Sequence, residues 1–337
     1  MVSFTSLKNR YTRGYLLRRG TNSVLVFFGM LLINFALPRL MPGNFAEIYL
    51  ATMVQDTRSL GVSKAKLEQE LNAQLGLGRP LLQQFTLYVS QIFSFPPSFG
   101  KSFQFYPTPA WNIVFYSARW TLLLLGLSQA LSWGFGVLVG AYMGLHKGTK
   151  VDRFLQPVMV FMLTIPPFWL GLMFIFLFAI DLRILPPVGA YALTPTLPSI
   201  LLHLILPVSV LVISNLPEYA IVFRNTVLEV LSSDFIMAIK AQGLRRTTFY
   251  SALIRNSMLP TLTQLFLSLG TLMGGIYTVE YTFSYPGMGT VIATAVFSRD
   301  FPVLEAALFL TALAIIIFNL FADLIYPLID PRISYVS

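Results

Sequence analysis

Stretches that carry no charged side chain are the feature that most limits how this chain can fold. They occupy residues 20–38, 120–145, 154–180, 184–217, 256–279 and 306–322. A helix of about 20 apolar residues crosses the hydrocarbon core of a bilayer, so each run is close to or beyond the length of one span. Only 11% of the residues are charged, whereas soluble proteins carry about 25%. The sequence therefore predicts an integral membrane protein.

The number of spans depends on how the longest run is divided. Residues 184–217 exceed the length of one helix, and Pro186, Pro187, Pro195 and Pro198 assign the first part of the run to an outer loop. The prediction is an all-α protein with six transmembrane helices, at 20–40, 118–145, 154–180, 200–223, 258–280 and 303–326. An even number of spans places both termini on the same side of the membrane.

The first run has one alternative interpretation, a cleaved signal peptide, because residues 1–19 are polar and basic. However, the run is about as long as a membrane span. Pro38, Arg39 and Pro42 follow it, where a signal peptide would have a cleavage site of small residues. We expect an uncleaved first helix whose N-terminus lies inside the cell.

The basic residues indicate how the helices are oriented. Segments 1–19, 146–153, 224–257 and 327–337 together hold 14 of the 23 Lys and Arg residues. An excess of Lys and Arg marks the cytoplasmic side of a membrane protein. We therefore expect a multi-pass protein of the cell membrane with these segments in the cytoplasm and residues 41–117 outside. This bias, with attraction to anionic lipid, explains the net charge of +9 without nucleic acid.

A polar island at residues 232–260 separates two of the long apolar runs. Ala238 and Ala241 lie on one helical face just before Gly243, where a helix can end because glycine tolerates positive φ. A second amphipathic helix is expected after Gly243, and Pro260 marks the entry to the next span. Two short helices folded at a glycine would form a compact projection that fits a groove of a soluble partner.

This island resembles the cytoplasmic "EAA" coupling loop of ABC-importer permeases, in the branch that carries dipeptides, oligopeptides and nickel. The matching residues are Asp234, Ala238, Ala241, Gly243, Leu244, Ile254, Asn256, Leu259 and Pro260, and Arg245 is expected to belong to the same coupling site. The branch usually has Glu at the position of Asp234, so this chain keeps the charge on a shorter side chain. The resemblance implies that loop 224–257 is the contact with the ATPase.

Other segments resemble the same branch from the first helix to the C-terminus. They read RLMPGN at 39–44, FGKSF at 99–103, VEYTFSYPGMG at 279–289, SRDFP at 298–302 and DLIYPLIDPRISY at 323–335. The extracytoplasmic segment after the first helix faces the substrate-binding protein in that branch. By resemblance, Glu280, Pro286, Gly287 and Gly289 are expected to form a docking site for that protein or an outer gate.

The family implies a set of partners for this chain. A second homologous permease, distinct or a second copy, would complete the translocation pathway; two cytoplasmic P-loop ATPases would supply energy and an extracytoplasmic protein would deliver cargo. ATP and Mg²⁺ would bind to the ATPases, since the nearest phosphate-loop-like string here, GLHKGTK at 144–150, has the wrong spacing. Peptides are the first expected substrate, with oligosaccharides or a metal chelate as alternatives.

Two other functional classes fit the residues less well. A membrane enzyme lacks support because the chain has no cysteine and only His146 and His203, with no metal-binding or Ser-His-Asp constellation. A self-sufficient carrier needs ionisable groups within the membrane. The candidates, Glu218, Glu280, Glu305, Asp323 and His203, all lie near helix ends. We therefore expect no catalytic residue, no metal and no cofactor in this chain.

Small residues recur on two of the predicted helices. Gly136, Gly140 and Gly144 are spaced four apart in the second helix, and Gly270 and Gly274 repeat this spacing in the fifth. Such stripes let membrane helices approach closely. They predict tight packing, either within the chain or against a partner permease.

Overall fold

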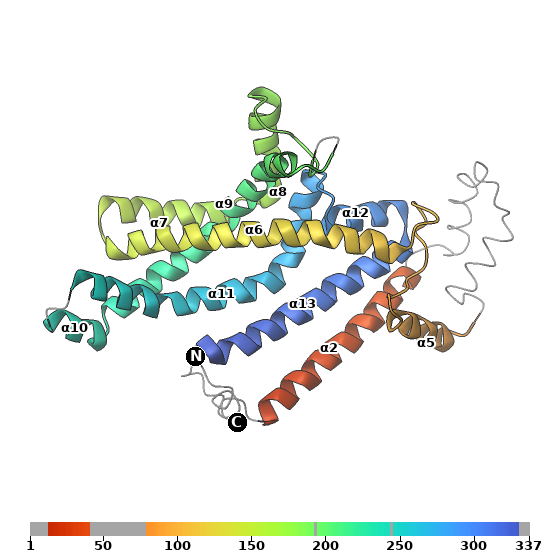
Figure 1. Ribbon diagram of the computed structural model, residues 1–337, viewed down its shortest axis with the longest axis horizontal. Coiled ribbons are helices and arrows are strands. Elements are labelled where there is room, and N and C mark those ends of the chain that lie inside the picture. Colours follow the sequence, from red (N-terminus) through yellow and green to blue (C-terminus); the bar gives the residue numbers. More distant parts are fainter. Residues whose placement is uncertain (1–12, 41–78, 192–193, 243–244, 330–337) are drawn as a thin grey trace. The chain divides into compact units, whose positions relative to one another are not determined.

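The computed structural model describes residues 13–40, 79–191, 194–242 and 245–329, and their regular structure is helical apart from one isolated β-bridge between Lys101 and Pro109. This confirms the all-α prediction for the described residues. In chain order (Figure 1) the elements are α2 (Arg13–Leu40), α5 (Leu81–Ile92), α6 (Ala110–Leu145), α7 (Lys150–Leu163), α8 (Pro167–Phe174), the π-helix η1 (Ile175–Asp181), α9 (Leu197–Leu231), α10 (Asp234–Ala241), α11 (Arg246–Thr282), α12 (Met288–Ser298) and α13 (Phe301–Ile329).

Three helices of the described chain are long and apolar enough to cross a membrane: α6, α9 and residues 301–321 of α13. A fourth span is present if α7 and the following α8–η1 segment cross as one unit. The apolar parts of α2, at 20–36, and of α12 are shorter. The chain is thus a multi-pass helical protein, and the six-span topology stays a prediction.

The predicted span 154–180 is bent. Its two halves, α7 and the α8–η1 segment, meet at 98°. The bend falls at Thr164, Ile165 and Pro166, which lie between the two helices, and Pro167 is the first residue of α8. Proline disfavours helical conformation in the residue before it and cannot donate its own backbone hydrogen bond, so paired prolines interrupt the helix here.

The chain forms two compact units, residues 1–15 with 120–289 and 315–337, and residues 16–119 with 290–314. In the first unit α9 contacts α7, α8, α10 and α11. Its apolar side chains form clusters with Met143 and Met159, and with Leu253 of α11. Helix α9 is therefore the element around which this unit is built.

The glycines of α6 lie directly against α9. A Cβ added at Gly136 would be 2.6 Å from the Tyr219 Cβ, and one at Gly144 would be 2.7 Å from Val227 Cγ1. At Gly140 it would collide with the carbonyl oxygen of Ala220. For these three glycines the close contact is internal to the chain. The surroundings of Gly270 and Gly274 lie outside the described residues.

The second unit joins two of the motifs that the sequence singled out. The Asp300 carboxylate accepts hydrogen bonds from the Ser102 hydroxyl and from the Gln104 backbone N–H at 3.1 Å. It also accepts one from the Val303 backbone N–H at 3.4 Å, at the start of α13. The loop after α5 and the entry to the last helix are thus bonded to each other. Helix α5 lies within the predicted extracytoplasmic segment 41–117, of which residues 41–78 lie outside the described residues.

Candidate functional site

The short helix α10 is attached to the end of α9 by a tight turn. Helix α9 ends at Leu231, where the hydroxyls of Ser232 and Ser233 donate to the carbonyls of Glu229 and Val230 at 2.8 and 2.7 Å. The Ser233 carbonyl then accepts from Ile236 N at 3.1 Å, within the first turn of α10. Serine hydroxyls compete for backbone groups at a helix end, so they redirect the chain while leaving few groups unpaired.

Helix α10 has one buried and one exposed face. Ile236 and Ile239 are buried, and α10 contacts both α9 and α11. The predicted coupling residues Asp234, Ala238 and Ala241 are all exposed, and they share their face with Met237, which is 54% exposed. The sequence reasoning missed Met237, a flexible apolar side chain of the kind that adapts to a partner surface.

The remaining predicted residues of the loop lie on α11 or near it. Arg245 precedes the helix, and Asn256 is exposed and donates to the Ala252 carbonyl at 2.7 Å. Thr247, Thr248, Ser251, Ala252, Arg255 and Asn256 line a shallow polar groove. Gly243 and Leu244 lie outside the described residues.

Helix α11 continues without a break through Pro260, whereas the sequence reasoning expected a separate amphipathic helix before the fifth span. Leu253, Ser257 and Thr261 are buried at a spacing of four residues across this point. Continuous packing along one face thus outweighs the loss of one backbone hydrogen bond at the proline. As a result, the polar groove and the apolar part of α11 belong to one helix.

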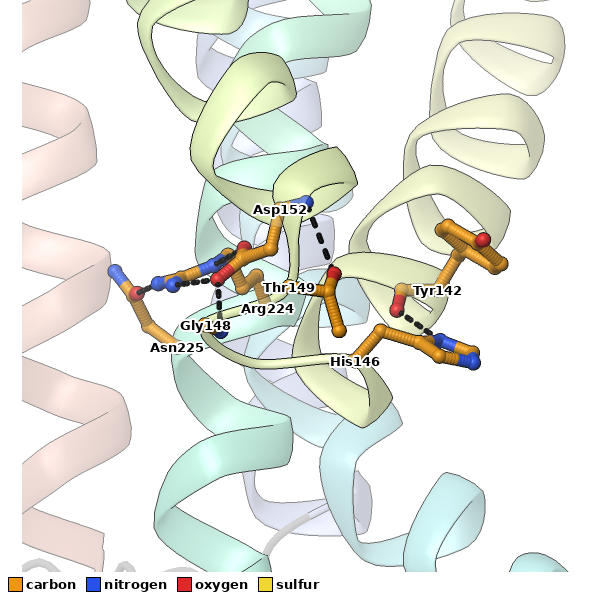
Figure 2. Close-up of polar contacts among 7 residues, drawn as sticks. All are labelled: Tyr142, His146, Gly148, Thr149, Asp152, Arg224 and Asn225. Carbon is orange, nitrogen blue, oxygen red and sulfur yellow. Dashed lines mark hydrogen bonds and ion pairs between the residues drawn. The ribbon is translucent and has the colours of Figure 1, made fainter.

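A buried ion pair joins α7 to α9 (Figure 2). The Arg224 Nε and Nη2 atoms donate to the two Asp152 carboxylate oxygens at 2.7 and 3.0 Å. The Gly148 backbone N–H donates to the same carboxylate at 2.9 Å. The Thr149 hydroxyl accepts from Asp152 N at 3.4 Å and caps α7. The side chain of Asp152 is therefore held by its own turn and by a distant helix.

The sequence reasoning counted Arg224 only as a cytoplasmic basic residue and did not single out Asp152. A local signal was present in the sequence, because Thr149 followed three residues later by Asp152 is a helix-capping pattern. The pairing itself spans 72 residues. Only the fold brings the two side chains together.

The structure brings Glu280, in the last turn of α11, together with Gly287 and Gly289 at the tight turn between α11 and α12. Glu280 is completely buried, and its carboxylate accepts a hydrogen bond from Gly289 N at 2.6 Å. A side chain at Gly287 would collide with this carboxylate, and one at Gly289 would collide with the backbone of Tyr277. Pro286 is half-buried between them. Glu280 therefore holds the shape of the turn, and the docking or gating role of the turn stays a prediction.

A small polar network lies among α6, α9 and α11. The Tyr219 hydroxyl bonds to Gln129 Oε1 at 2.7 Å and to Ser268 Oγ at 2.6 Å. A cavity of about 50 Å³ borders it, with Ser128, Gln129, Ser214 and Asn215 in its wall. Its lining contains no carboxylate and no histidine, and no cluster of three potential metal ligands occurs in the described part of the chain.

These features define a class of protein, a multi-pass helical membrane protein with an exposed short helix set between two long ones. More specifically, the chain belongs to the family of binding-protein-dependent transport system inner membrane components, whose model matches residues 136–335. It is thus a membrane permease subunit of a binding-protein-dependent ABC importer. The matched region includes α10, the ion pair and the Glu280 turn.

Several relatives match almost the whole chain. A di/tripeptide transport system permease protein of Pseudomonas aeruginosa is 31% identical over 343 residues, covering 95% of this chain and 98% of its own. An oligopeptide transport system permease protein of Bacillus subtilis is 28% identical, covering 95% of this chain and 99% of its own. A dipeptide transport system permease protein of Escherichia coli is 28% identical, with 95% and 98% covered.

Proposed function

We propose that the exposed face of α10, with the start of α11, is the surface on which cytoplasmic ATPase subunits act. The observation that carries this proposal is the division of α10 into two faces. Its buried face, with Ile236 and Ile239, fixes it to the rest of the unit. Its exposed face carries Asp234, Met237, Ala238 and Ala241. A partner that binds this face can therefore move α10 together with the elements to which its buried face is fixed.

In this mechanism the ATPases bind and hydrolyse ATP, and this chain supplies no catalytic group. Closure of two ATPase subunits on ATP moves α10 and, through the short turn at Ser232 and Ser233, moves α9. The six proposed spans, together with those of a second homologous permease, then switch from an inward-open to an outward-open pathway. Both termini lie in the cytoplasm in this arrangement, and the Glu280 turn faces the binding protein outside.

Peptides are the proposed cargo. The permeases of Pseudomonas aeruginosa, Bacillus subtilis and Escherichia coli are named for transport of di/tripeptides, oligopeptides and dipeptides respectively. All three align with this chain over nearly its full length. Purification of the chain in mild detergent should recover a second permease and P-loop ATPases, and the associated binding protein should bind peptides. Recovery of this chain alone as an active transporter would contradict the proposed assembly.

A charge on the exposed face of α10 should separate ATP hydrolysis from transport. We expect Ala241→Asp to reduce peptide uptake at least about tenfold while the complex still hydrolyses ATP, because a buried unpaired charge at an interface costs several kcal/mol. Uptake and hydrolysis are measured together in proteoliposomes. Ala241→Asn is the matched control, since it places a side chain of nearly the same size at the same position without the charge. Normal uptake by the Ala241→Asp protein would count against the coupling role of α10.

A further inference from the structure

We infer that the Asp152–Arg224 ion pair is a positioning contact for transport, which makes α7 move together with α9 when α10 is displaced. This inference rests on the proposed function, because it concerns how motion of α10 reaches the membrane helices. The ion pair is not part of the ATPase contact itself. Its place is between that contact and the helices that must move.

The ion pair is bidentate and buried, unlike a typical ion pair at a protein surface. Both carboxylate oxygens of Asp152 are engaged by Arg224, at 2.7 and 3.0 Å, in a bidentate arrangement. The two residues are only 3% and 9% exposed. Bidentate Arg–carboxylate contacts fix orientation as well as distance. Exposed ion pairs contribute little, whereas breaking a buried pair leaves a desolvated charge without a partner.

The neighbouring contacts between α7 and α9 are apolar and do not fix the helices in the same way. Met159 packs in a cluster with Met143 and Ala220, flanked by Leu155 and other aliphatic side chains. Such contacts are non-directional, and methionine side chains adapt to small displacements. The ion pair is thus the contact that sets the register of α7 along α9.

The same level of α9 is also held against α6. A Cβ at Gly144 would lie 2.7 Å from Val227 and 3.3 Å from the Arg224 carbonyl oxygen, so the two backbones are in close contact there. The turn from α6 to α7 contains Gly148, at φ +78°, whose N–H donates to Asp152. Helices α6, α7 and α9 therefore meet around one carboxylate (Figure 2).

Arg224 lies on the direct path from α10 into the membrane helices. It precedes Leu231, the last residue of α9, by seven positions, or about 10 Å along the helix. Helix α9 is continuous over this distance, and the short turn at Ser232 and Ser233 joins it to α10. A push on α10 is thus delivered to Arg224 along a stiff element, and the ion pair passes it to α7 and to the turn that follows α6.

The test uses the complete complex with its ATPases and binding protein in proteoliposomes, and the measured quantity is peptide uptake per ATP hydrolysed. Asp152→Asn and Arg224→Gln should each lower this ratio about tenfold, while ATP hydrolysis continues. Arg224→Lys, which keeps the charge but loses the bidentate contact, should fall between these variants and the unmodified protein. Arg153→Gln, which removes the exposed charge next to Asp152, should leave the ratio unchanged.

The double variant Asp152→Asn with Arg224→Gln distinguishes loss of the contact from misfolding. It leaves no unpaired buried charge that could destabilise the fold. We expect its ratio to be no lower than that of either single variant, since all three lack the same contact. If uptake and hydrolysis fall in proportion, or if the double variant does not assemble, the pair has only a structural role and the inference is wrong. It is also wrong if the ratio stays normal in all variants.

A parallel measurement on Ala241→Asp separates this inference from the function on which it rests. If Ala241→Asp lowers uptake per ATP and the Asp152 variants do not, the coupling surface stands and only the positioning role fails. If Ala241→Asp has no effect, the proposed coupling function itself fails.

Discussion

Replacing Gly140 by Ala is expected to destabilise the protein by about 1–3 kcal/mol or more, the cost of overpacking a tight interior. The added methyl group would collide with the carbonyl oxygen of Ala220 and lie 2.9 Å from the Phe223 Cβ. Backbone atoms of α9 cannot rotate out of the way as a flexible side chain can. Helices α6 and α9 would have to separate, which the free energy of unfolding measured by titration with a denaturing detergent should detect.

Gly134 provides a matched control on the same helix. A Cβ there would have no atom within 4 Å, so Gly134→Ala should not reduce stability. It can even increase stability by up to about 1 kcal/mol, because alanine is the better helix former. Equal effects of the two substitutions would show that contact with α9 does not account for the change.

The membrane character of the chain was predictable because a bilayer imposes a length and an absence of charge on each span. The runs at 120–145 and 306–322 coincide with α6 and α13, two of the helices that are apolar enough to cross. The 98° bend near Pro166 was not predicted, although the paired prolines were visible. Prolines within membrane helices are common, and α9 continues through Pro207 and Pro217 without being divided.

Helix α12 was also absent from the prediction. It follows the turn at Pro286 and has only 11 residues, too few for a span, so its apolar character did not identify it. The continuity of α11 was missed for the opposite reason. Pro260 and the polar residues before it indicated a boundary, whereas the packing of Leu253, Ser257 and Thr261 carries the helix past that point.

The exposed face of α10 was predictable because its residues are close together in the sequence. Ala238 and Ala241 stand three apart in the sequence, and a helix necessarily places them on one face. Two features depended on the fold instead. The Asp152–Arg224 pair joins residues far apart in the chain. The burial of Glu280 could not be read from its position at the end of an apolar run, which would equally suit an exposed carboxylate.

Replacing Glu280 by Ala is expected to disorder the turn that follows α11. The substitution removes the acceptor of the Gly289 N–H, a buried donor bonded at 2.6 Å, and leaving such a donor unpaired costs about 1–3 kcal/mol. It also removes the carboxylate against which Gly287 packs. We therefore expect faster amide exchange and faster proteolysis between Tyr281 and Gly289, and weaker binding of the substrate-binding protein if this turn forms its docking site.

Two further variants test whether the effect on the turn is specific to the Glu280 side chain. Glu280→Gln keeps an acceptor of the same size for Gly289 and should retain most of the protection, because the geometry of the turn needs an oxygen atom more than a charge. Glu218→Ala removes an exposed carboxylate that accepts one hydrogen bond from Gln264 at 2.5 Å, and it should leave exchange in the 281–289 segment unchanged. If Glu280→Ala also left that exchange unchanged, the two glycines and Met288, whose N–H donates to Thr121 Oγ1 at 2.8 Å, would hold the turn without the glutamate.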